Sequence, residues 1–186
     1  GDTHGPRRSP VTSAYMPEAI ALAEDAFNYR ERITRSRQRN GSKITGIGIG
    51  QGYHDAGRSG MDGIVRLTPD GRLKIHSGVG NLGTFSYAST SRAAAEVLQM
   101  EWDQCDVISG RTDRHVPMTS PQDGSNSIFT NTRTNWGAAQ DLLTKMKEIA
   151  AMDLGGQAGD YDIDGSRVFR SSNPSVSMSY AQIAQR

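Results

Sequence analysis

Apolar side chains near the start of the chain recur every three to four residues, at Leu22, Ala26, Tyr29 and Ile33. This spacing predicts one helix, which begins at Pro17, a residue favoured in the first helical turn, and ends near Gly41. The arginines in its last part suit a solvated helix C-terminus. Residues 1–16 contain two prolines and two glycines and have no periodicity. We therefore expect an irregular lead-in that another surface would order.

Runs of alternating apolar and polar residues predict strands in the next part of the chain. Residues 61–68 and 72–79 alternate in this way, and a Pro-Asp-Gly turn at 69–71 separates them. This arrangement predicts an antiparallel hairpin. Two further strands are expected, one at 44–52, where glycines alternate with larger residues, and one at 105–110.

Two longer helices are predicted downstream of the hairpin. Residues 84–99 are rich in alanine and serine, which gives a helix able to pack very close to a sheet or a cofactor. The longest helix carries a stripe spaced by four and three residues, at Thr132, Trp136, Ala139, Leu143, Met146 and Ala150. Such a stripe is expected to face the core.

The last part of the chain predicts two short strands around Asp164 and Gly165, followed by a short helix. Ser177 is the expected N-cap of that helix, which covers residues 179–186 and reaches the last residue without a stop signal. We therefore expect this polypeptide to be a fragment or a processed piece. The predicted fold is mixed α/β, of the α+β type, with an antiparallel-containing sheet and packed helices.

Composition narrows the function classes. A chain of 186 residues can form one domain with a real core. The formal net charge of +1 is too balanced for a dedicated nucleic-acid binder. No run of 18 apolar residues is present, so no membrane insertion is expected. The single cysteine, Cys105, excludes an internal disulfide and an iron–sulfur cluster within the chain, and is interpreted as an inert buried thiol.

A glycine motif, G-x-G-x-x-G, covers residues 78–83 between a predicted strand and a predicted helix. This is the context of a dinucleotide-binding turn. Two observations argue against that function. The preceding strand is expected to pair in a hairpin, and the next strand ends at Gly110 and Arg111, without a carboxylate for a ribose. A phosphate or other anion site at the helix N-terminus and a simple tight turn both stay open.

The polar loop at 117–131 leads directly into the longest helix. Ser125, Asn126 and Ser127 place hydroxyl and amide groups at its start. This entrance and the one near Gly83 are both rich in small polar residues, so we expect them to be two walls of one pocket for a phosphorylated ligand. Ordinary helix capping is the alternative.

Other chemistry is not supported by the sequence. The four histidines, His4, His54, His76 and His115, lack the spacing of metal ligands. Residues 160–165 copy the first half of a calcium loop, but its twelfth position is Ser171 instead of Glu, so a hairpin turn is expected there. We predict no catalytic group and no metal ligand in this chain.

The order of these segments resembles the molybdopterin-binding large subunit of the xanthine oxidase and aldehyde oxidoreductase family. The resemblance is carried by KITGIGIGQG (43–52), HSGVGNLGTFSYASTSRAAAEVL (76–98), CDVISGRTDRHVP (105–117), TSPQDGSNS (119–127) and TNWGAAQDLL (134–143). It implies that residues 17–186 are a segment of the molybdopterin-binding domain.

The resemblance also implies which residues hold the cofactor. In that family the Gly-rich turn and the Ser-rich loop bind the molybdopterin and its phosphate tail. The matching positions are Gly83, Thr84 and Phe85 in the first wall, and Gly124, Ser125, Asn126 and Ser127 in the second. Whether the pterin carries a nucleotide is left open.

The chain departs from the family pattern at the first wall. The family commonly has Gly-Gln-Gly there, with the glutamine close to the molybdenum, whereas this chain has Thr84 at the position of the glutamine. Gln51 is no substitute, because it belongs to the earlier predicted strand. The family's catalytic glutamate segment, G-x-G-E, and its Gly-Gly-x-Phe-Gly stretch are both missing from this sequence.

The resemblance implies a molybdenum-dependent oxidoreductase of aldehydes, N-heterocycles or similar small molecules. The isolated chain is expected to be inactive. The remaining part of the large subunit would complete the pocket, and iron–sulfur and flavin (FAD) or cytochrome centres would lie in partner chains. Two alternatives are a non-catalytic scaffold subunit, suggested by Thr84, and a nucleotide-dependent dehydrogenase using the motif at 78–83.

Overall fold

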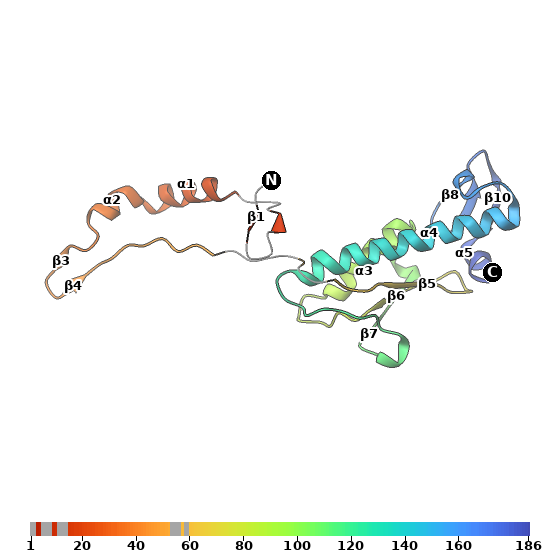
Figure 1. Cartoon of the computed structure of the whole chain (residues 1–186), viewed down its shortest axis with the longest axis horizontal. Coiled ribbons are helices and arrows are strands. Elements are labelled where there is room, and N and C mark those ends of the chain that lie inside the picture. Colours follow the sequence, from red (N-terminus) through yellow and green to blue (C-terminus); the bar gives the residue numbers. More distant parts are fainter. Residues whose placement is uncertain (1–2, 5–8, 11–14, 53–56, 58–59) are drawn as a thin grey trace. The chain divides into compact units, whose positions relative to one another are not determined.

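The chain divides into two compact units, residues 1–53 and residues 54–186 (Figure 1). This computed structural model describes residues 3–4, 9–10, 15–52, 57 and 60–186. Each unit is described by itself.

Unit 1 contains two helices and short strand pairs. Its elements are β1 (Thr3–His4), β2 (Ser9–Pro10), α1 (Met16–Phe27), α2 (Tyr29–Thr34), β3 (Arg39–Asn40) and β4 (Lys43–Ile44). β1 pairs with β2 and β3 with β4, both antiparallel. The predicted start at Pro17 is confirmed, because this proline lies in the first turn of α1. The prediction of one helix is wrong, since Asn28 adopts a left-handed conformation, with φ 50°, that ends α1.

The strand predicted at 44–52 is largely absent. Only Lys43–Ile44 forms a strand, and residues 45–52 have no regular secondary structure. The physical reason is that a strand needs a neighbour for its backbone groups. Within residues 15–52, the paired strands are limited to the β3–β4 hairpin.

Unit 2 is built on a three-stranded sheet. Its strands are β5 (Ile64–Leu67), β6 (Leu73–Ser77) and β7 (Cys105–Ser109), in the order β5-β6-β7. β5 and β6 are antiparallel, which confirms the predicted hairpin, and the turn is closed by a 2.7 Å bond from the Gly71 N–H to the Thr68 carbonyl. The strand predicted at 105–110 is also confirmed.

Two helices pack against each other beside this sheet (Figure 1). α3 (Ser86–Val97) confirms the predicted small-residue helix. α4 (Thr132–Leu154) is the longest helix, and a π-helical turn, η3 (Ser127–Asn131), leads into it. Short 3₁₀ turns η1 (Trp102–Gln104) and η2 (Thr112–Arg114) flank β7.

The predicted stripe of α4 is buried at three of its six positions, half-buried at Thr132 and Leu143, and exposed at Trp136. Ala139, Met146 and Ala150 are buried, whereas Trp136 is 53% exposed. Asn135 is fully buried instead. Successive residues on a helix are rotated by 100° about its axis. The buried face of α4 therefore includes Asn135, whereas the apolar pattern assigned Trp136 to it. The reason is a polar contact with α3 that the pattern of hydrophobic residues does not record.

The C-terminal part adds a second sheet and a last helix. Its elements are η4 (Ala158–Asp160), β8 (Tyr161–Ile163), β9 (Arg167–Arg170), β10 (Asn173–Ser179) and α5 (Tyr180–Ala184). The sheet is antiparallel, in the order β10-β9-β8. The two strands predicted around Asp164 are confirmed, and a third was missed. The N-cap prediction is wrong: Ser177 lies in β10, and Ser179 caps α5 in a capping box with Gln182.

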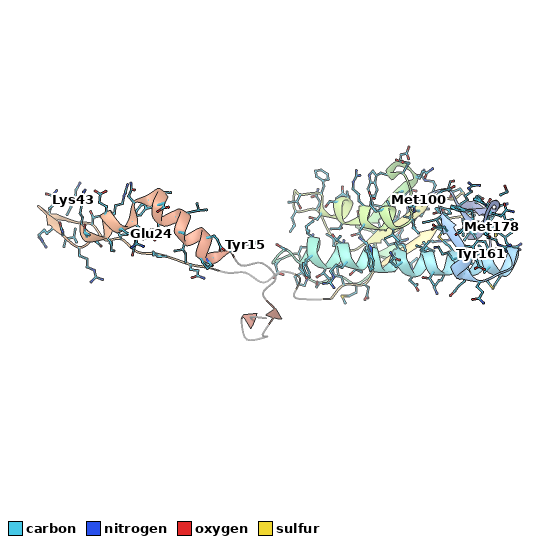
Figure 2. All side chains as sticks on the ribbon, turned by 90° about the horizontal axis from the view of Figure 1, so that it is seen from above. Tyr15, Glu24, Lys43, Met100, Tyr161 and Met178 are labelled. Carbon is cyan, nitrogen blue, oxygen red and sulfur yellow. The ribbon has the colours of Figure 1, made fainter. Side chains whose placement is uncertain are left out.

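One core joins both sheets to α3 and α4. Tyr161 and Met178 lie over the C-terminal half of α4 (Figure 2), and the Tyr180 hydroxyl donates to the Leu98 carbonyl at the end of α3 at 2.9 Å. The fully buried members are Leu73, Ile75, Ala94, Leu98, Ala139, Met146, Ala150 and Val168. The mixed α/β fold class is therefore confirmed.

The turn between β8 and β9 reaches the end of α3. Gly165 has φ +87°, and a Cβ atom at this position would collide with the Gln99 carbonyl oxygen. We predict that Gly165→Ala lowers the free energy of unfolding by about 1–3 kcal/mol, because both the left-handed backbone and the close approach oppose a side chain. Thermal unfolding followed by circular dichroism measures this effect.

Gly159→Ala is the matched control for this prediction. Gly159 lies in η4, where an added Cβ would meet nothing within 4 Å. Its melting temperature is expected to stay close to that of the parent. Equal melting temperatures for the two alanine variants would contradict the close packing of the β8–β9 turn on α3.

Candidate functional site

The first wall of the predicted pocket lies in a βαβ unit. β6 and β7 are parallel, with Leu73 opposite Cys105 and Ser77 opposite Ser109, and α3 connects them. The expectation that hairpin pairing excludes such a unit is wrong, because β6 is the central strand and pairs with both neighbours. The motif at 78–83 therefore occupies a strand-to-helix turn at the carboxyl end of a parallel strand, where α/β proteins bind ligands.

Gly83 and its neighbours form an exposed turn at the start of α3. The Asn81 Oδ1 atom accepts from the Gly83 N–H at 2.9 Å and from the Phe85 N–H at 3.1 Å. Two backbone donors at this helix entrance are thus capped by Asn81. Gly83 has φ +89°, and a Cβ there would meet nothing within 4 Å, so its backbone is open to close approach.

Thr84 and Phe85 complete the first wall. The Thr84 hydroxyl is 2.6 Å from that of Ser86, which holds it at the helix start. Phe85 is 60% exposed and has φ 52°. A left-handed backbone is an outlier for a bulky residue, and strain of this kind concentrates at functional sites.

The second wall is the loop that enters η3. Gly124 and Ser125 are consecutive left-handed residues, with φ 51° and 55°. The side chain of Asn126 is 1% exposed and braces the loop: its Nδ2 donates to the Ser120 hydroxyl, and its Oδ1 accepts from Thr130 at 2.8 Å. Ser125 is exposed and Ser127, the first residue of η3, is half-buried.

Direct contacts join the two loops that carry the walls. The Gln122 side chain accepts from the Gly80 N–H at 3.1 Å and donates to the Gly80 carbonyl at 2.9 Å. The Thr119 hydroxyl donates to the Gly78 carbonyl at 3.3 Å, and a Cβ on Gly78 would lie 2.6 Å from the Pro117 carbonyl oxygen. Glycines 78 and 80 therefore serve loop-to-loop contact in this chain.

Gln122 is a site residue that sequence reasoning missed. The role of Gln122 depends on its side-chain amide forming hydrogen bonds with the peptide groups of Gly80. No spacing in the sequence indicates this pair, because the two residues are 42 positions apart. The Ser-rich loop was recognised, but the residue that attaches it to the first wall was not.

Behind the walls, a buried polar contact aligns the two helices. The Asn131 Nδ2 atom donates to the Thr90 hydroxyl at 2.7 Å, and the Asn135 Nδ2 atom donates to the Thr90 carbonyl at 3.1 Å. The Thr90 hydroxyl in turn donates to the Ser86 carbonyl at 2.7 Å. These residues lie in the first turns of α3 and of the η3–α4 segment, so both helix entrances lie at the same end of unit 2.

The remaining candidate groups are structural. His76 is buried, with its Nδ1 atom 2.8 Å from the Arg114 carbonyl oxygen. Burial raises the pKa of the half-buried Cys105 thiol to about 11, so it stays protonated at neutral pH. The antiparallel pairing of β8 with β9 confirms the turn predicted at Asp164 and Gly165. In this turn the hydrogen bond with Arg167 lowers the pKa of Asp164 to about 2. His54 lies outside the described residues.

Neither a metal centre nor a membrane span is found in the part of the chain that the structure describes. No three histidine, cysteine, aspartate or glutamate side chains group there as ligands. None of the described helices is long and apolar enough to cross a bilayer.

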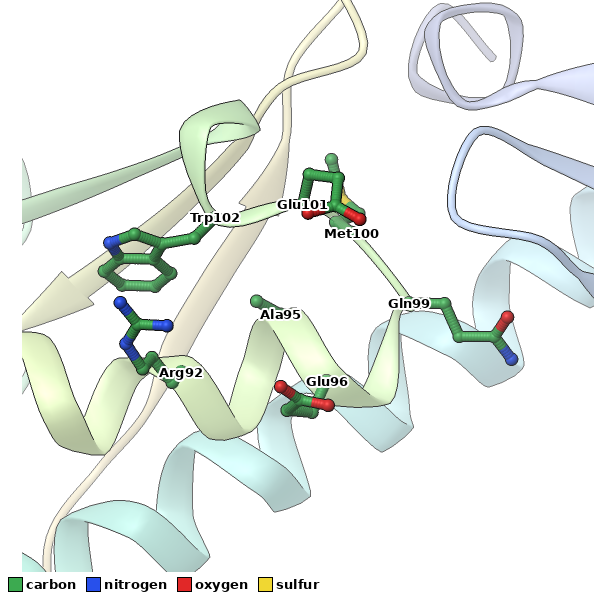
Figure 3. Close-up of a pocket in the computed structure, with 7 residues that line it drawn as sticks. All are labelled: Arg92, Ala95, Glu96, Gln99, Met100, Glu101 and Trp102. Atoms are coloured by element: carbon green, nitrogen blue, oxygen red, sulfur yellow. The ribbon is translucent and has the colours of Figure 1, made fainter.

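A cavity of about 310 Å³ lies elsewhere, between the C-terminal half of α3 and the segment that follows it, residues 99–102 (Figure 3). The Arg92 guanidinium lies 4.8 Å from the centre of the Trp102 ring, and Glu96 and Glu101 flank them. None of the residues of the two walls lines this cavity. It therefore has no part in the predicted pocket.

The two walls offer neutral hydrogen-bond donors at the positive ends of two helices. The exposed or half-buried donors are the hydroxyls of Thr84, Ser125 and Ser127, beside the open backbone of Gly83. Donors of this kind at helix N-termini stabilise phosphate and polar ring systems. The residues fit the binding and orientation of a phosphate-bearing cofactor, and they offer no acid–base pair for a proton transfer.

Comparison with known proteins gives a consistent match. The model of the molybdopterin cofactor-binding domain family matches residues 22–186. The aldehyde oxidoreductase molybdenum-binding subunit PaoC of Escherichia coli O157:H7 is 25% identical over 139 residues, which cover 74% of this chain and 18% of that protein. The probable hypoxanthine oxidase XdhD of Escherichia coli K12 is 28% identical over 171 residues, 89% of this chain and 18% of that protein.

Solved structures agree in fold. Quinoline 2-oxidoreductase from Pseudomonas putida 86 superposes with a TM-score of 0.61 at 17% identity, over 97% of this chain and 25% of that one. Carbon monoxide dehydrogenase from Oligotropha carboxidovorans gives a TM-score of 0.61 at 18% identity, over 92% of this chain and 24% of that one. The chain thus spans less than a fifth of the length of the curated relatives it matches.

We predict that Gln122→Ala loosens the contact between the two walls. The Gly80 amide loses its acceptor, so its hydrogen exchange should become about tenfold faster or more. The melting temperature should change little, because a pair of exposed hydrogen bonds contributes only about 0.5–1.5 kcal/mol each. Hydrogen–deuterium exchange with residue-level fragmentation measures the effect.

Gln140→Ala removes the same amide from a position on α4 outside both loops. Its Gly80 exchange rate should match that of the parent. Unchanged exchange at Gly80 in the Gln122 variant would show that the two walls are held together by other contacts.

Proposed function

The chain belongs to the molybdopterin cofactor-binding domain family, and on this premise we propose that residues 83–85 and 124–127 hold part of the molybdopterin. The observation that carries the proposal is the contact between Gln122 and Gly80, which joins the two loops that lead into the donor-rich helix entrances. Both helix N-termini can bind a phosphate, and both lie at the same end of unit 2. One shared ligand explains this arrangement better than two unrelated helix caps.

Each wall would have its own task in this arrangement. The open backbone at Gly83 lets a flat pterin ring or a phosphate approach closely, and the Thr84 hydroxyl lies beside it. Ser125 and Ser127 offer hydroxyl donors at the start of η3. Asn126 is buried and would act by bracing the loop from behind.

The cofactor would supply the redox centre that this chain lacks. When bound, molybdenum in its pterin ligand accepts two electrons from an organic substrate. The chain's own residues would bind and orient the group and exclude water from one side of it. The wall residues, which are glycine, threonine, phenylalanine, serine and asparagine, include no carboxylate or imidazole, so the general base of the reaction would come from outside the two walls.

The whole enzyme would then be a molybdenum-dependent oxidoreductase of small organic molecules such as aldehydes or N-heterocycles. The names of the relatives, an aldehyde oxidoreductase subunit and a probable hypoxanthine oxidase, support this substrate class. The relatives are four to six times longer than the aligned segment, which supports further polypeptide around this chain. The electron-transfer centres would lie in partner chains. The family match argues against the nucleotide-dependent dehydrogenase.

We predict that Gly124→Val lowers the molybdenum content of the native assembly. Gly124 has φ 51° in the second wall, so a branched side chain both strains the loop and blocks close approach to the cofactor. Molybdenum per chain, measured by elemental mass spectrometry on the purified assembly, should fall at least about fivefold, since losing one close approach costs about 1 kcal/mol or more.

Gly71→Val is the matched control, because Gly71 has a similar left-handed backbone, with φ +82°, in the β5–β6 turn. It should lower stability and leave the molybdenum content unchanged. Equal molybdenum in the Gly124 variant and the parent would contradict the placement of the second wall. A native assembly without molybdenum would favour a scaffold subunit.

A second prediction concerns Thr84. If its side chain faces the metal centre, Thr84→Gln introduces an amide there and should change kcat or the preference among aldehyde and heterocyclic substrates. The melting temperature should move little, because the residue is exposed. Steady-state kinetics of the assembled enzyme measure the effect.

Thr84→Val removes the same hydroxyl without adding an amide, so the difference between the two variants isolates the amide. Identical kinetics in the glutamine and valine variants would place Thr84 at the helix start only, where its hydroxyl contacts Ser86.

A further inference from the structure

Phe85 has a backbone conformation and an exposure that the chain's own packing does not explain. Its φ and ψ are 52° and 33°, a left-handed conformation that is an outlier for a bulky side chain. Among the described non-glycine residues with positive φ, Phe85 is the one with a purely apolar side chain. That side chain is 60% exposed and does not belong to the buried core. The cost of the conformation is therefore not offset by burial of the ring.

The backbone of Phe85 is nevertheless held firmly in place. Its N–H donates to Asn81 Oδ1 at 3.1 Å, and its carbonyl accepts from the Ala88 N–H at 3.0 Å and the Ser89 N–H at 3.2 Å. The centre of the Tyr87 ring lies 6.1 Å from that of Phe85, with the two planes tilted by 51°. The Phe85 ring is thus attached to a fixed backbone and keeps most of its surface open.

The chemistry of the Phe85 side chain differs from that of the other first-wall residues. The proposed cofactor contacts in this wall are the open backbone of Gly83 and the Thr84 hydroxyl. Phe85 has no side-chain donor, and its N–H is already bonded to Asn81. The residue offers a flat apolar face instead, in the same turn as Leu82, which is 68% exposed. Faces of this kind favour contact with another aromatic ring.

We propose that the Phe85 ring is a specificity-determining contact for the organic substrate. It selects planar aromatic rings, as in aromatic aldehydes and N-heterocycles, over saturated rings of the same size. The inference rests on the proposed function, because it needs the cofactor at the same wall. Aromatic pairs in an offset or edge-to-face arrangement are more stable than their buried area alone explains. The substrate ring would gain this stabilisation, and a saturated ring would not.

Two substitutions in the native assembly test the aromatic face. Phe85→Leu keeps an apolar side chain and removes the face, whereas Phe85→Tyr keeps the face. The substrates are benzaldehyde and cyclohexanecarbaldehyde, whose rings have the same number of carbons and differ in aromaticity. The ratio of their kcat/KM values should fall about three- to tenfold in Phe85→Leu. In Phe85→Tyr the ratio should stay close to that of the parent.

A binding measurement tests the same contact without turnover. Phe85 is replaced by 4-fluorophenylalanine in the native assembly, and its fluorine NMR signal is followed during titration. Quinoline, which is planar and aromatic, should shift the signal until the site is saturated. Decahydroquinoline has the same ring skeleton without aromaticity and should shift it much less. Absence of a shift with quinoline would show that another part of the protein covers the ring, and would overturn the proposal.

Two further variants separate substrate contact from a structural role. Trp136→Leu is the matched control, because it removes a ring that is 53% exposed on α4, outside both walls. Its substrate ratio should match that of the parent. Phe85→Gly removes the ring and relieves the left-handed backbone, so the ratio should fall while the melting temperature does not. A lower melting temperature with an unchanged ratio would assign Phe85 to the start of α3 only.

Molybdenum content distinguishes failure of this proposal from failure of the proposed function. Phe85→Leu should retain the molybdenum content of the parent assembly, because the ring donates no hydrogen bond to the cofactor. Loss of molybdenum in this variant would assign the ring to the cofactor and overturn the proposal. An unchanged substrate ratio in a molybdenum-containing Phe85→Leu assembly would overturn this inference alone. A parent assembly without molybdenum would contradict the proposed function itself.

Discussion

The contact between Thr90 and two asparagines fixes how α3 and the η3–α4 segment pack. Thr90 accepts from Asn131 with its hydroxyl and from Asn135 with its carbonyl, and all three residues are buried. A buried amide without a partner costs about 1–3 kcal/mol, so a shift of either helix by one turn would be penalised. The register of the helices, and with it the position of both loops in front of them, depends on this contact.

The two loops in front of the helices combine firm attachment with open donors. Gln122 ties one loop to the other at Gly80, and Asn126 braces its own loop from the inside. Strained residues, Phe85 and Ser125, lie beside these anchors, with left-handed backbones. Under the proposed function, such a site would be arranged before its ligand arrives, which would lower the entropic cost of binding. It is suited to holding a large cofactor and leaves the chemistry to groups elsewhere.

Unit 1 differs physically from this rigid frame. Residues 15–52 contain no buried side chain, and residues 45–52 have no regular secondary structure. Unit 2 in contrast has its own core around Leu73, Leu98 and Met146. Residues 15–52 thus have no core of their own, whereas unit 2 is stabilised by its own core. The strand that local pattern predicts at 44–52 illustrates the point, because its missing partner is the reason that only two of its residues pair.

Local patterns in the sequence determined the hairpin, the small-residue helix, the strand at 105–110, the longest helix and the two entrances rich in small polar residues. These features follow from spacing and turn chemistry, which act between neighbours along the chain. Tertiary structure alone decided that β6 pairs on both sides, that Asn135 instead of Trp136 faces the core, and that Gln122 reaches Gly80. Each of these depends on a polar or backbone contact between residues far apart in sequence, and such a contact leaves no periodic trace in the chain itself.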